Sequence, residues 1–294
     1  MSKKVVCFGE MLWDCFPDKE IPGGAPMNVA LHLKQLGLDV RMVSRLGKDE
    51  YGKKYLDFIQ SYDFDISLIQ IDEEHATGTV TVHDEDPENI RYTIVSPVAW
   101  DFIALNEANK EAVSGADAFI FGSLAIRNNR SWETLYQLIH QPTLKVFDIN
   151  LRAPFFDFEK IEIMLGFTDI LKINEDELEI VADYFGIAPD VNACCKLLTT
   201  HFPIKMVCIT LGSKGAMIYR DGNIFQHPGY KVTVADTVGS GDAFLAGFTK
   251  SYLQWKTPDQ TLQFACAMGA FVATKNGGTP KYSESEVWRV GGFQ

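Results

Sequence analysis

The sequence predicts an α/β fold with a doubly wound, mostly parallel sheet, helices on both of its faces and a small β-strand lid. Three observations predict it. Short apolar runs alternate with longer helical patterns along most of the chain. The apolar runs are typical of strands buried on both faces. Two stretches rich in β-branched, aromatic and polar residues interrupt this alternation, and they predict strands outside the main sheet.

The elements of the main body follow one another in chain order. The predicted buried strands are residues 5–9, 40–44, 118–122, 146–149, 169–173 and 206–210. The predicted helices between them are residues 27–36, 50–61, 131–140, 175–185 and 191–199. Residues 217–219 and 224–226 flank the turn sequence Asp221-Gly222-Asn223 and predict a hairpin. Residues 243–255 and 258–275 predict two long closing helices.

The two interrupting stretches are residues 11–21 and 77–95. The first mixes aromatic residues with Asp and Pro directly after the first strand, and the second carries two β-branched runs around a polar loop. An ordinary surface hairpin is the alternative interpretation of the second stretch. Both stretches lie at strand-to-helix transitions, where open α/β sheets bind ligands. We therefore expect them to form a lid within a single domain of residues 1–294.

Composition limits the functions of the chain. Lys plus Arg total 27 and Asp plus Glu total 39, which gives a net charge of −12 at pH 7. This balance argues against nucleic acid and anionic membranes as partners, because both require a basic surface. No run approaches the roughly 18 apolar residues of a membrane helix. The six cysteines lack Cys-x-x-Cys spacing, and the first apolar run breaks at Glu10, too early for a signal peptide, so we expect a cytoplasmic protein.

The segment 235–248 carries the strongest chemical signal. Gly239, Ser240 and Gly241 directly precede an apolar helix, and Asp242 lies at its start. Free N–H groups at a helix start bind anions, and small residues let a phosphate approach them. A helix-capping role is the alternative for Asp242, but capping does not require three small residues before it. The pattern predicts phosphoryl transfer, in which Asp242 accepts the proton of an attacking hydroxyl and the amides of residues 239–241 stabilise the transferred group.

A second segment combines glycines with polar side chains. Gly23 and Gly24 precede a predicted helix that carries Asn28, and Asp14 follows the first strand. For the two glycines alone, a tight turn is the simpler interpretation. Together with a carboxylate and an amide side chain, however, they form the mixture of groups that binds hydroxyl-rich ligands.

Both segments resemble the two signatures of the PfkB, or ribokinase-like, carbohydrate kinases. Residues 23–30, followed by Gly37 and Gly47, resemble the first signature, and residues 236–242, continuing to Gly247, resemble the second. Residues 9–14 and 23–28 are most similar to fructokinases, since ribokinases tend to carry Lys in place of Ala25. The resemblance extends along essentially the whole chain. It implies a ribokinase-like fold and an ATP-dependent sugar kinase that converts fructose to fructose 6-phosphate.

The resemblance also implies a nucleotide and metal site. Asn174 and Glu177 match the Asn-x-x-Glu motif, which organises Mg²⁺ and phosphate chiefly through water. From the residues alone, a capping Asn with first-turn acids is the simpler interpretation. Residues 148–152 match a segment that would bring Arg152 toward the phosphates, with a surface salt bridge as the alternative. The implied ATP-binding residues are Asn174, Glu177, Thr210, Gly212, Gly215 and Asn276, the last within the expected adenine pocket of residues 273–280.

Many members of the family hold a monovalent cation such as K⁺ beside the anion site. Asp236 and the carbonyl of Val238 match part of that cation site. Lys214, in the expected nucleotide loop, is interpreted as a solvated charge. The exposed strand edges of the lid lead us to expect a homodimer, because such edges need to be covered.

Two other functions remain open from the sequence. The first is a kinase for another small alcohol, such as ribose, a nucleoside, tagatose or a keto-deoxy sugar acid. The second is a non-catalytic sugar or nucleotide sensor with the same fold. The presence of Asp242 after Gly239, Ser240 and Gly241 counts against a sensor, because a sensor does not need a catalytic base.

Overall fold

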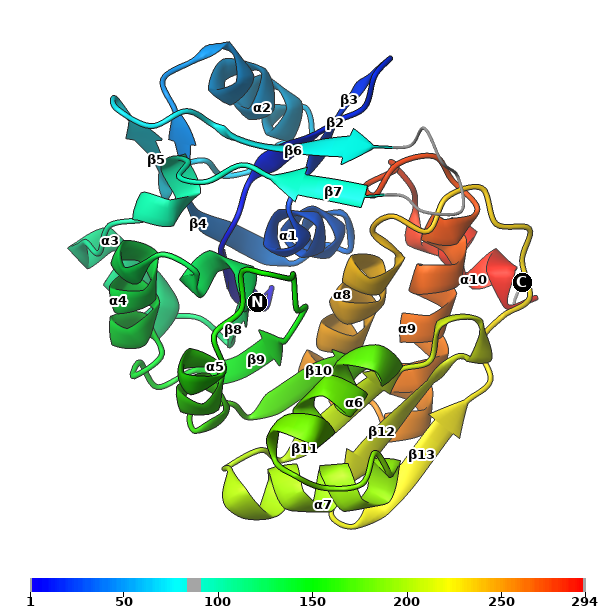
Figure 1. Cartoon of the computed structure of the whole chain (residues 1–294). Helices are drawn as coiled ribbons and strands as arrows, with labels where there is room; N and C mark the ends of the chain where they lie inside the picture. Colours follow the sequence, from blue (N-terminus) through cyan, green and yellow to red (C-terminus); the bar gives the residue numbers. More distant parts are fainter. Residues whose placement is uncertain (1, 84–90, 293–294) are drawn as a thin grey trace.

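A computed structural model describes residues 2–83 and 91–292 of the chain. Within these ranges, nine strands form the main sheet in the order β13-β12-β11-β10-β9-β8-β1-β4-β5 (Figure 1). Their bounds are β1 Lys4–Phe8, β4 Asp39–Gly47, β5 Ile69–Asp72, β8 Ala118–Gly122, β9 Leu144–Asp148, β10 Ile170–Asn174, β11 Met206–Thr210, β12 Ala216–Arg220 and β13 Asn223–His227. Strands β12 and β13 pair antiparallel with their neighbours, and the other neighbouring pairs are parallel. The α/β prediction is confirmed.

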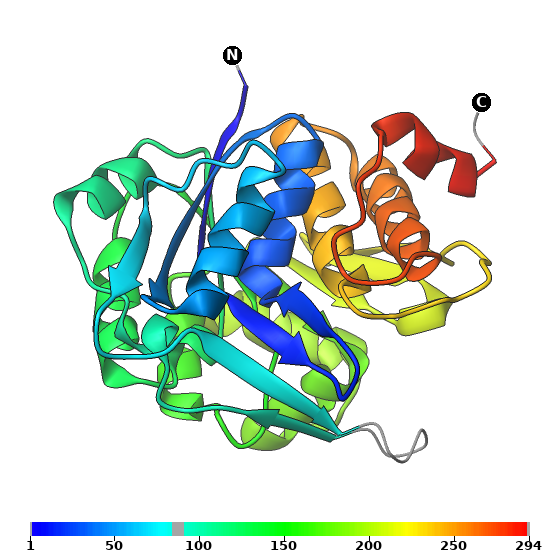
Figure 2. The ribbon, with the colours of Figure 1, turned by 90° about the horizontal axis from the view of Figure 1, so that it is seen from above.

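Helices cover both faces of this sheet (Figures 1 and 2). On one face lie α1 (Ala25–Gln35), α2 (Glu50–Gln60), α8 (Ser240–Leu253), α9 (Pro258–Ala273) and α10 (Glu284–Val290). On the other face lie α3 (Glu107–Ser114), α4 (Asn129–Leu138), α5 (Phe158–Leu165), α6 (Glu175–Tyr184) and α7 (Val191–His201). Short 3₁₀ helices are η1 (Ala99–Phe102), η2 (Leu124–Ile126) and η3 (Gly212–Lys214).

Two apolar cores result from the alternation of side chains along the strands. In β1, Val5 and Cys7 pack into the core under α1 and α8, whereas Val6 and Phe8 pack into the core under α3 to α7. This explains why the strand sequences are continuously apolar: each face of the sheet requires its own buried side chains.

A second, smaller sheet lies beside the main one and has the strand order β3-β2-β6-β7 in the described part of the chain. Its strands are β2 Leu12–Cys15, β3 Glu20–Gly23, β6 Gly78–His83 and β7 Arg91–Ile94. They come from the two stretches 11–21 and 77–95, and Figure 2 shows them below α1 and α2, with the ends of β6 and β7 projecting outward. Part of the second stretch, residues 84–90, lies outside the described residues. The function of this sheet as a lid stays a prediction.

The hairpin predicted after β11 is confirmed as β12 and β13. Its turn residues Asp221 and Gly222 have φ values of 51° and 76°, the positive values that a tight two-residue hairpin turn requires. Four elements are absent from the sequence prediction: β5, α3, α5 and α10. All are short, with four to eight residues, and such segments provide few positions on which to detect a period.

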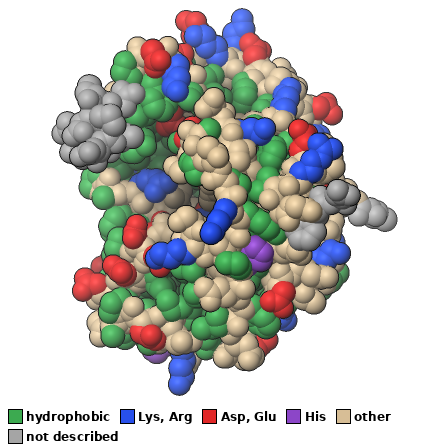
Figure 3. Space-filling view, turned by 90° about the vertical axis from the view of Figure 1, so that its right-hand side faces the viewer, with side chains coloured by type: hydrophobic (Ala, Val, Ile, Leu, Met, Phe, Trp, Pro, Cys, Tyr) green, Lys and Arg blue, Asp and Glu red, His purple; other side chains and the backbone are tan. Residues whose placement is uncertain are grey.

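Two expectations drawn from composition can be compared with the structure. All six cysteines lie in the described ranges; they are free, and five of them are buried. None of the described helices is long and apolar enough to cross a membrane. In the view of Figure 3, acidic and basic side chains are intermixed, and neither sign forms a continuous patch on that face.

Candidate active site

The carboxyl ends of β1, β8, β9 and β10 lie at one edge of the main sheet, because these neighbouring strands are parallel. Helices α1 and α8 begin at this edge and pack against each other (Figure 1). The small sheet lies at the same edge, because β2 follows β1 after a short connection and β3 leads directly into α1. The topology therefore brings the two chemical segments of the sequence to one place.

The side chains of Asn28 and Asp242 meet at this edge. Asn28 Nδ2 donates a hydrogen bond to Asp242 Oδ2 over 2.8 Å, although 214 positions separate the two residues. Burial raises the pKa of Asp242 to about 6, and the hydrogen bond from Asn28 opposes this rise. Asp242 is therefore ionised near neutral pH, and its pKa is closer to neutrality than that of an ordinary aspartate. Both properties suit a general base.

The start of α8 is open to a ligand. Gly239 occupies the N-cap position with a φ of 73°, and no described side chain caps the helix. A Cβ atom on Gly239 would lie 2.5 Å from the Cα of Gly278, so both the conformation and the packing require glycine. The Ser240 N–H donates to the Thr237 carbonyl over 3.2 Å, which engages one of the three amides expected to bind phosphate. The Ser240 Oγ atom is buried and has no hydrogen-bond partner in the described part of the chain.

The expected sugar-binding residues are also close together. A Cβ atom on Gly23 would collide with the Asp14 carboxylate, so the side chain of Asp14 lies directly over Gly23. Burial raises the pKa of Asp14 to about 6; the charge of Arg152 lowers it, and that of Asp242 raises it. Asp14 is therefore close enough to Arg152 and Asp242 for their charges to act on it. Gly24 is the N-cap of α1, with a φ of 110°, and its Cα packs against the backbone of residue 10.

Two buried charged groups near this site are absent from the sequence prediction. Glu10 is 2% exposed, and burial raises its pKa to about 7. Lys172 is 7% exposed, and its Nζ donates to Asp148 Oδ1 over 2.8 Å. Burial lowers the pKa of Lys172, but the carboxylate of Asp148 outweighs this and raises it. The sequence signals were a Glu directly after the first apolar run and a Lys inside another apolar run.

Lys172 lies beneath the start of α8. A Cβ atom on Gly241 would be 3.8 Å from Lys172 Nζ, and the charge of Lys172 lowers the pKa of Asp242. The buried positive charge of Lys172 can therefore act on the Asp242 carboxylate and on a group bound at the start of α8.

Asn174 and Glu177 form a reciprocal helix cap. Asn174 Oδ1 accepts from the Glu177 N–H over 2.8 Å, and Glu177 Oε2 accepts from the Asn174 N–H over 3.0 Å. The other carboxylate oxygen of Glu177 accepts from the Leu151 N–H over 3.0 Å. The local structure thus follows the simpler of the two interpretations. The backbone N–H groups of Asn174 and Leu151 thus hold the Glu177 carboxylate in one orientation.

The nucleotide-loop residues lie after β11. Thr210 ends this strand, Gly212 has a φ of 55°, and the space where a Cβ on Gly212 would lie is open. Gly215 instead packs against the backbone of residues 227–229, where a side chain would not fit, so the fold itself requires glycine at this position. Lys214 forms an exposed ion pair with Glu175 at 3.2 Å, which agrees with a surface charge.

Of the remaining candidates, Asp236 and Asn276 lie near the end of α9, and Arg152 follows β9 in the chain. Asp236 accepts hydrogen bonds from Val238 N–H over 3.0 Å and from Gly277 N–H over 3.2 Å, which ties the loop before α8 to the segment after α9. Asn276 is exposed in that segment. Arg152 is exposed and donates to the carbonyl of Leu151 over 3.3 Å; no described residue forms an ion pair with it, so the expected alternative of a salt bridge is not observed.

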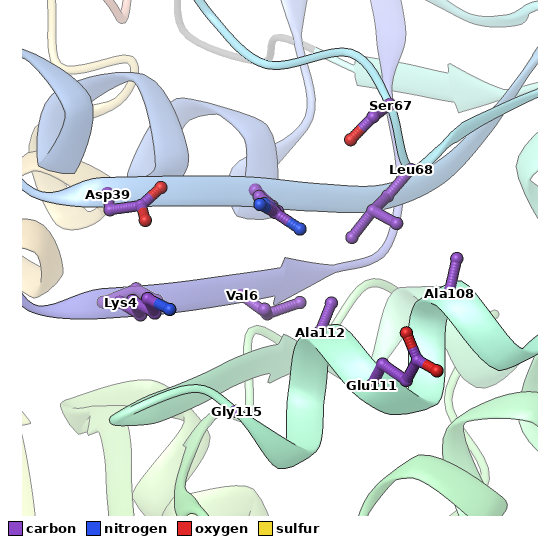
Figure 4. A pocket seen from close by; sticks show the side chains of 11 residues that line it. Lys4, Val6, Asp39, Ser67, Leu68, Ala108, Glu111, Ala112 and Gly115 are labelled. Carbon is purple, nitrogen blue, oxygen red and sulfur yellow. The ribbon is translucent and has the colours of Figure 1, made fainter.

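A separate pocket of about 270 Å³ lies at the opposite edge of the main sheet (Figure 4). It is bounded by the first residues of β1 and β4 and by α3, with Lys4, Asp39 and Glu111 among its lining side chains. None of the predicted site residues lines it. The residues expected to take part in catalysis therefore lie at the carboxyl edge of the sheet. There Asp242 at the start of α8 lies near the polar side chains of Asp14 and Asn28. This arrangement is suited to phosphoryl transfer to a hydroxyl group.

Comparisons with known proteins agree with phosphoryl transfer to a hydroxyl group. The family described as pfkB family carbohydrate kinase matches residues 2–285. Fructokinase-1 of Oryza sativa subsp. japonica is 29% identical over 324 residues, which cover 98% of this chain and 98% of the relative. The structure is similar to that of a fructokinase with bound ATP from Xylella fastidiosa, with a TM-score of 0.87, 22% identity, and coverage of 99% of this chain and 98% of that chain.

A kinase named for a different substrate has a similar fold. The 2-dehydro-3-deoxygluconokinase of Thermotoga maritima has a TM-score of 0.86 to this structure at 20% identity, covering 99% of this chain and all of that one. The chain belongs to the pfkB family of carbohydrate kinases. It is accordingly a phosphotransferase that acts on a sugar hydroxyl, built on the ribokinase-like fold.

Proposed function

We propose that the protein is an ATP-dependent fructokinase that converts fructose to fructose 6-phosphate. The observation that carries the kinase mechanism is the 2.8 Å hydrogen bond between Asn28 and Asp242, and the similarity to fructokinases supports fructose as the acceptor. It joins the base at the start of α8 to the helix that follows the expected sugar-binding residues. A hydroxyl bound next to Asn28 would therefore be within reach of the base and of the open helix start.

In this proposal, Asp242 accepts the proton of the sugar hydroxyl while the oxygen attacks the γ-phosphorus of ATP. The bond between that phosphorus and the bridging oxygen of ADP breaks, so the products are a sugar phosphate and ADP. The amides of Gly239 and Gly241, with that of Ser240 once released from Thr237, stabilise the charge on the transferred group. Asp14, Gly23, Gly24 and Asn28 hold the other hydroxyls of the sugar.

ATP would bind along Thr210, Gly212 and Gly215, with Asn276 at the adenine. Mg²⁺ would be held chiefly by the phosphates and by water molecules bonded to Glu177, since Mg²⁺ keeps several of its waters in such sites. Asp236 and the carbonyl of Val238 would contribute to a K⁺ site beside the start of α8. Oxygen ligands of this kind suit both ions.

The small sheet is proposed to be a lid over the sugar, within a single domain of residues 1–294. Its support is that Asp14 and Gly23 belong to β2 and β3, so the lid itself would carry sugar ligands. In hydrogen exchange at saturating fructose, β2, β3, β6 and β7 should gain protection, while β9 should barely change. Unchanged exchange in the small sheet would favour a surface sheet without a lid function.

A homodimer is also proposed, and the described small sheet has β3 and β7 at its edges. Tyr92 on β7 is largely exposed, and an apolar side chain on an edge strand favours pairing with another chain. Light scattering on the eluting protein should give twice the chain mass, and the mass of one chain would contradict the proposal.

The substrate is tested by measuring ADP release with a panel of acceptors. The panel contains fructose, ribose, a nucleoside, tagatose and a keto-deoxy sugar acid. We expect the highest kcat/KM with fructose. A clear preference for another acceptor would overturn the fructokinase assignment and leave the kinase mechanism in place. Binding of a sugar without ADP release from any acceptor would instead favour a sensor.

A further inference from the structure

Residues 277–282, here called the strap, lie between α9 and α10 and are bonded to α1 and to the end of α2. Gln35 Nε2 donates to the Pro280 carbonyl and Gln35 Oε1 accepts from the Tyr282 N–H, each over 3.2 Å. The hydroxyl of Tyr62 donates to the Thr279 carbonyl over 2.7 Å. The strap is therefore held by elements that lie more than 200 positions away in the sequence.

His32 holds the start of the strap. It lies on α1, one helical turn after Asn28, and its side chain is fully buried. The His32 Nε2 atom is 2.9 Å from the Gly278 carbonyl oxygen, and Nδ1 is 3.0 Å from the Tyr282 hydroxyl. A carbonyl oxygen can only accept a hydrogen bond, so Nε2 must carry the proton. In the neutral ring, Nδ1 then accepts from Tyr282, and the burial that lowers the pKa of His32 to about 4 keeps the ring neutral.

Gly278, which His32 holds, packs directly on the start of α8. A Cβ atom on Gly278 would lie 3.4 Å from both the Cα of Gly239 and the Nδ2 of Asn28. The backbones of Gly239 and Gly278 are thus in contact, with no side chain between them. A displacement of Gly278 would remove one wall of the pocket in which Gly239 adopts its positive φ.

We propose that His32 is a positioning residue, which holds Gly278 against Gly239 and thereby keeps the open start of α8 in line with the base. Helix α1 then holds both parts of the catalytic apparatus, the carboxylate of Asp242 through Asn28 and the anion-binding backbone through His32. This inference rests on the proposed roles of Asp242 and of the amides at residues 239–241.

A histidine with only a structural role would satisfy the same hydrogen bonds. The two roles differ in their kinetic consequences. A structural role predicts a loss of stability with unchanged turnover per folded molecule. A positioning role predicts a loss of kcat at nearly constant KM for the sugar, because His32 forms its hydrogen bonds with Gly278 and Tyr282 and not with the sugar ligands Asp14 and Asn28.

The test compares four variants of the full chain. His32→Leu keeps the volume and removes both hydrogen bonds, whereas His32→Gln keeps an N–H donor. Tyr62→Phe is the matched control, because it removes a strap bond at Thr279 without touching Gly278. Asp242→Asn reports on the proposed base. Each variant is assayed for kcat, for KM of the sugar and for thermal unfolding.

We expect His32→Leu to lower kcat by about tenfold or more and to change the sugar KM by less than about threefold, because small displacements of catalytic groups have large effects on rate. His32→Gln should recover a large part of the lost kcat, and Tyr62→Phe should keep the wild-type kcat. A folded His32→Leu variant with wild-type kcat would overturn the inference. If that variant does not fold, His32→Phe decides, since it keeps a ring and also removes the hydrogen bond to Gly278; a wild-type kcat in that variant would then overturn the inference as well.

Two further readouts separate the possible failures. Nitrogen NMR of labelled histidine should show a neutral His32 ring with the proton on Nε2, and the Nδ1–H tautomer would contradict the inference. A wild-type protein without phosphoryl transfer would refute the proposed function, and a fully active Asp242→Asn variant would refute the assignment of Asp242 as the base. If both behave as proposed while His32→Leu keeps its kcat, only the positioning role fails.

Discussion

Helices α1 and α8 begin differently from α2, α6 and α9. The N-caps of α1 and α8 are Gly24 and Gly239, with φ values of 110° and 73°, and no described side chain caps either helix. In contrast, the side chains of Asp49, Asn174 and Thr257 accept hydrogen bonds from the first turns of α2, α6 and α9. A capped helix start has already satisfied part of its N–H groups within the protein, and an uncapped one retains them for a ligand.

The two uncapped helices also differ from each other. Burial raises the pKa of the Glu10 carboxyl, which follows β1 in the chain, and the backbone of Ala25 at the start of α1 opposes this rise. No described carboxylate from another element bonds to the start of α8 in this way. The start of α1 therefore already has a carboxyl group of the protein beside it, whereas the start of α8 can receive the negative charge of a phosphoryl group.

The largest effect is expected from removing the carboxylate at the start of α8. Asp242→Asn should lower kcat by roughly 10²- to 10⁴-fold, the range typical for loss of a general base. Its thermal stability should be retained, because the amide is uncharged and the burial that raises the pKa of Asp242 disfavours the charged form. Steady-state kinetics would measure kcat, and thermal unfolding would measure the stability. Turnover close to that of the wild type in a well-folded variant would contradict the assignment of the base.

A smaller effect is expected on the α1 side of the site. Asp14→Ala would leave buried sugar hydroxyls without a partner, at about 1–3 kcal/mol for each. The kcat/KM for fructose should fall by roughly ten- to a hundredfold, and the KM for ATP should change far less. Asp18→Ala, in the exposed turn of the same sheet, is the control and should behave like the wild type. An equal rise in the KM for ATP would show that Asp14 is not a sugar ligand.

The pH dependence should report the base at the start of α8. Its carboxylate must be ionised to accept a proton, so kcat/KM should fall as the pH drops below the Asp242 pKa of about 6. Asn28→Ala removes a hydrogen bond that lowers this pKa, so the acidic limb should move to higher pH. Glu10→Gln is the control, because Glu10 titrates nearby with a pKa of about 7. Loss of the acidic limb in that variant would assign the limb to Glu10 instead.

The smallest effect is expected at a capped helix. Thr257→Ala removes the side chain that accepts from the Gln260 N–H at the start of α9. Unfolding in urea should show a loss of about 1 kcal/mol, and kcat should not change. A fall in kcat/KM as large as that expected for Asp14→Ala would mean that the capped start of α9 also contributes to catalysis.

The sequence predicted those parts of the molecule that depend on local patterns. The continuous apolar runs predicted six strands of the main sheet, and Asp221-Gly222-Asn223 predicted the hairpin. The long apolar pattern after residue 241 predicted α8, whereas the anion site at residues 239–242 stays a prediction. In these cases the residues that determine the local structure lie close together in the sequence.

Contacts between distant segments could not be predicted in the same way. His32 occupies one position in an amphipathic helix, and nothing near it in the sequence indicates Gly278 as its partner. Lys172 lies inside a predicted strand, and the pattern of that strand does not indicate that Lys172 is buried beside Asp148. Both are polar side chains that need a hydrogen-bond partner because they are buried, and their burial depends on the assembled fold.

The register of β2 has a consequence for insertions and deletions. Leu12 pairs with Gly23 and Asp14 with Ile21, and the connecting turn covers residues 16–19. An additional residue in this turn would leave the paired positions in place. A single residue inserted between positions 12 and 14 would turn Asp14 to the opposite face of the strand, because neighbouring side chains point in opposite directions. Length variation among natural or engineered forms of this enzyme should therefore accumulate in the turn and be absent from the three positions before Cys15.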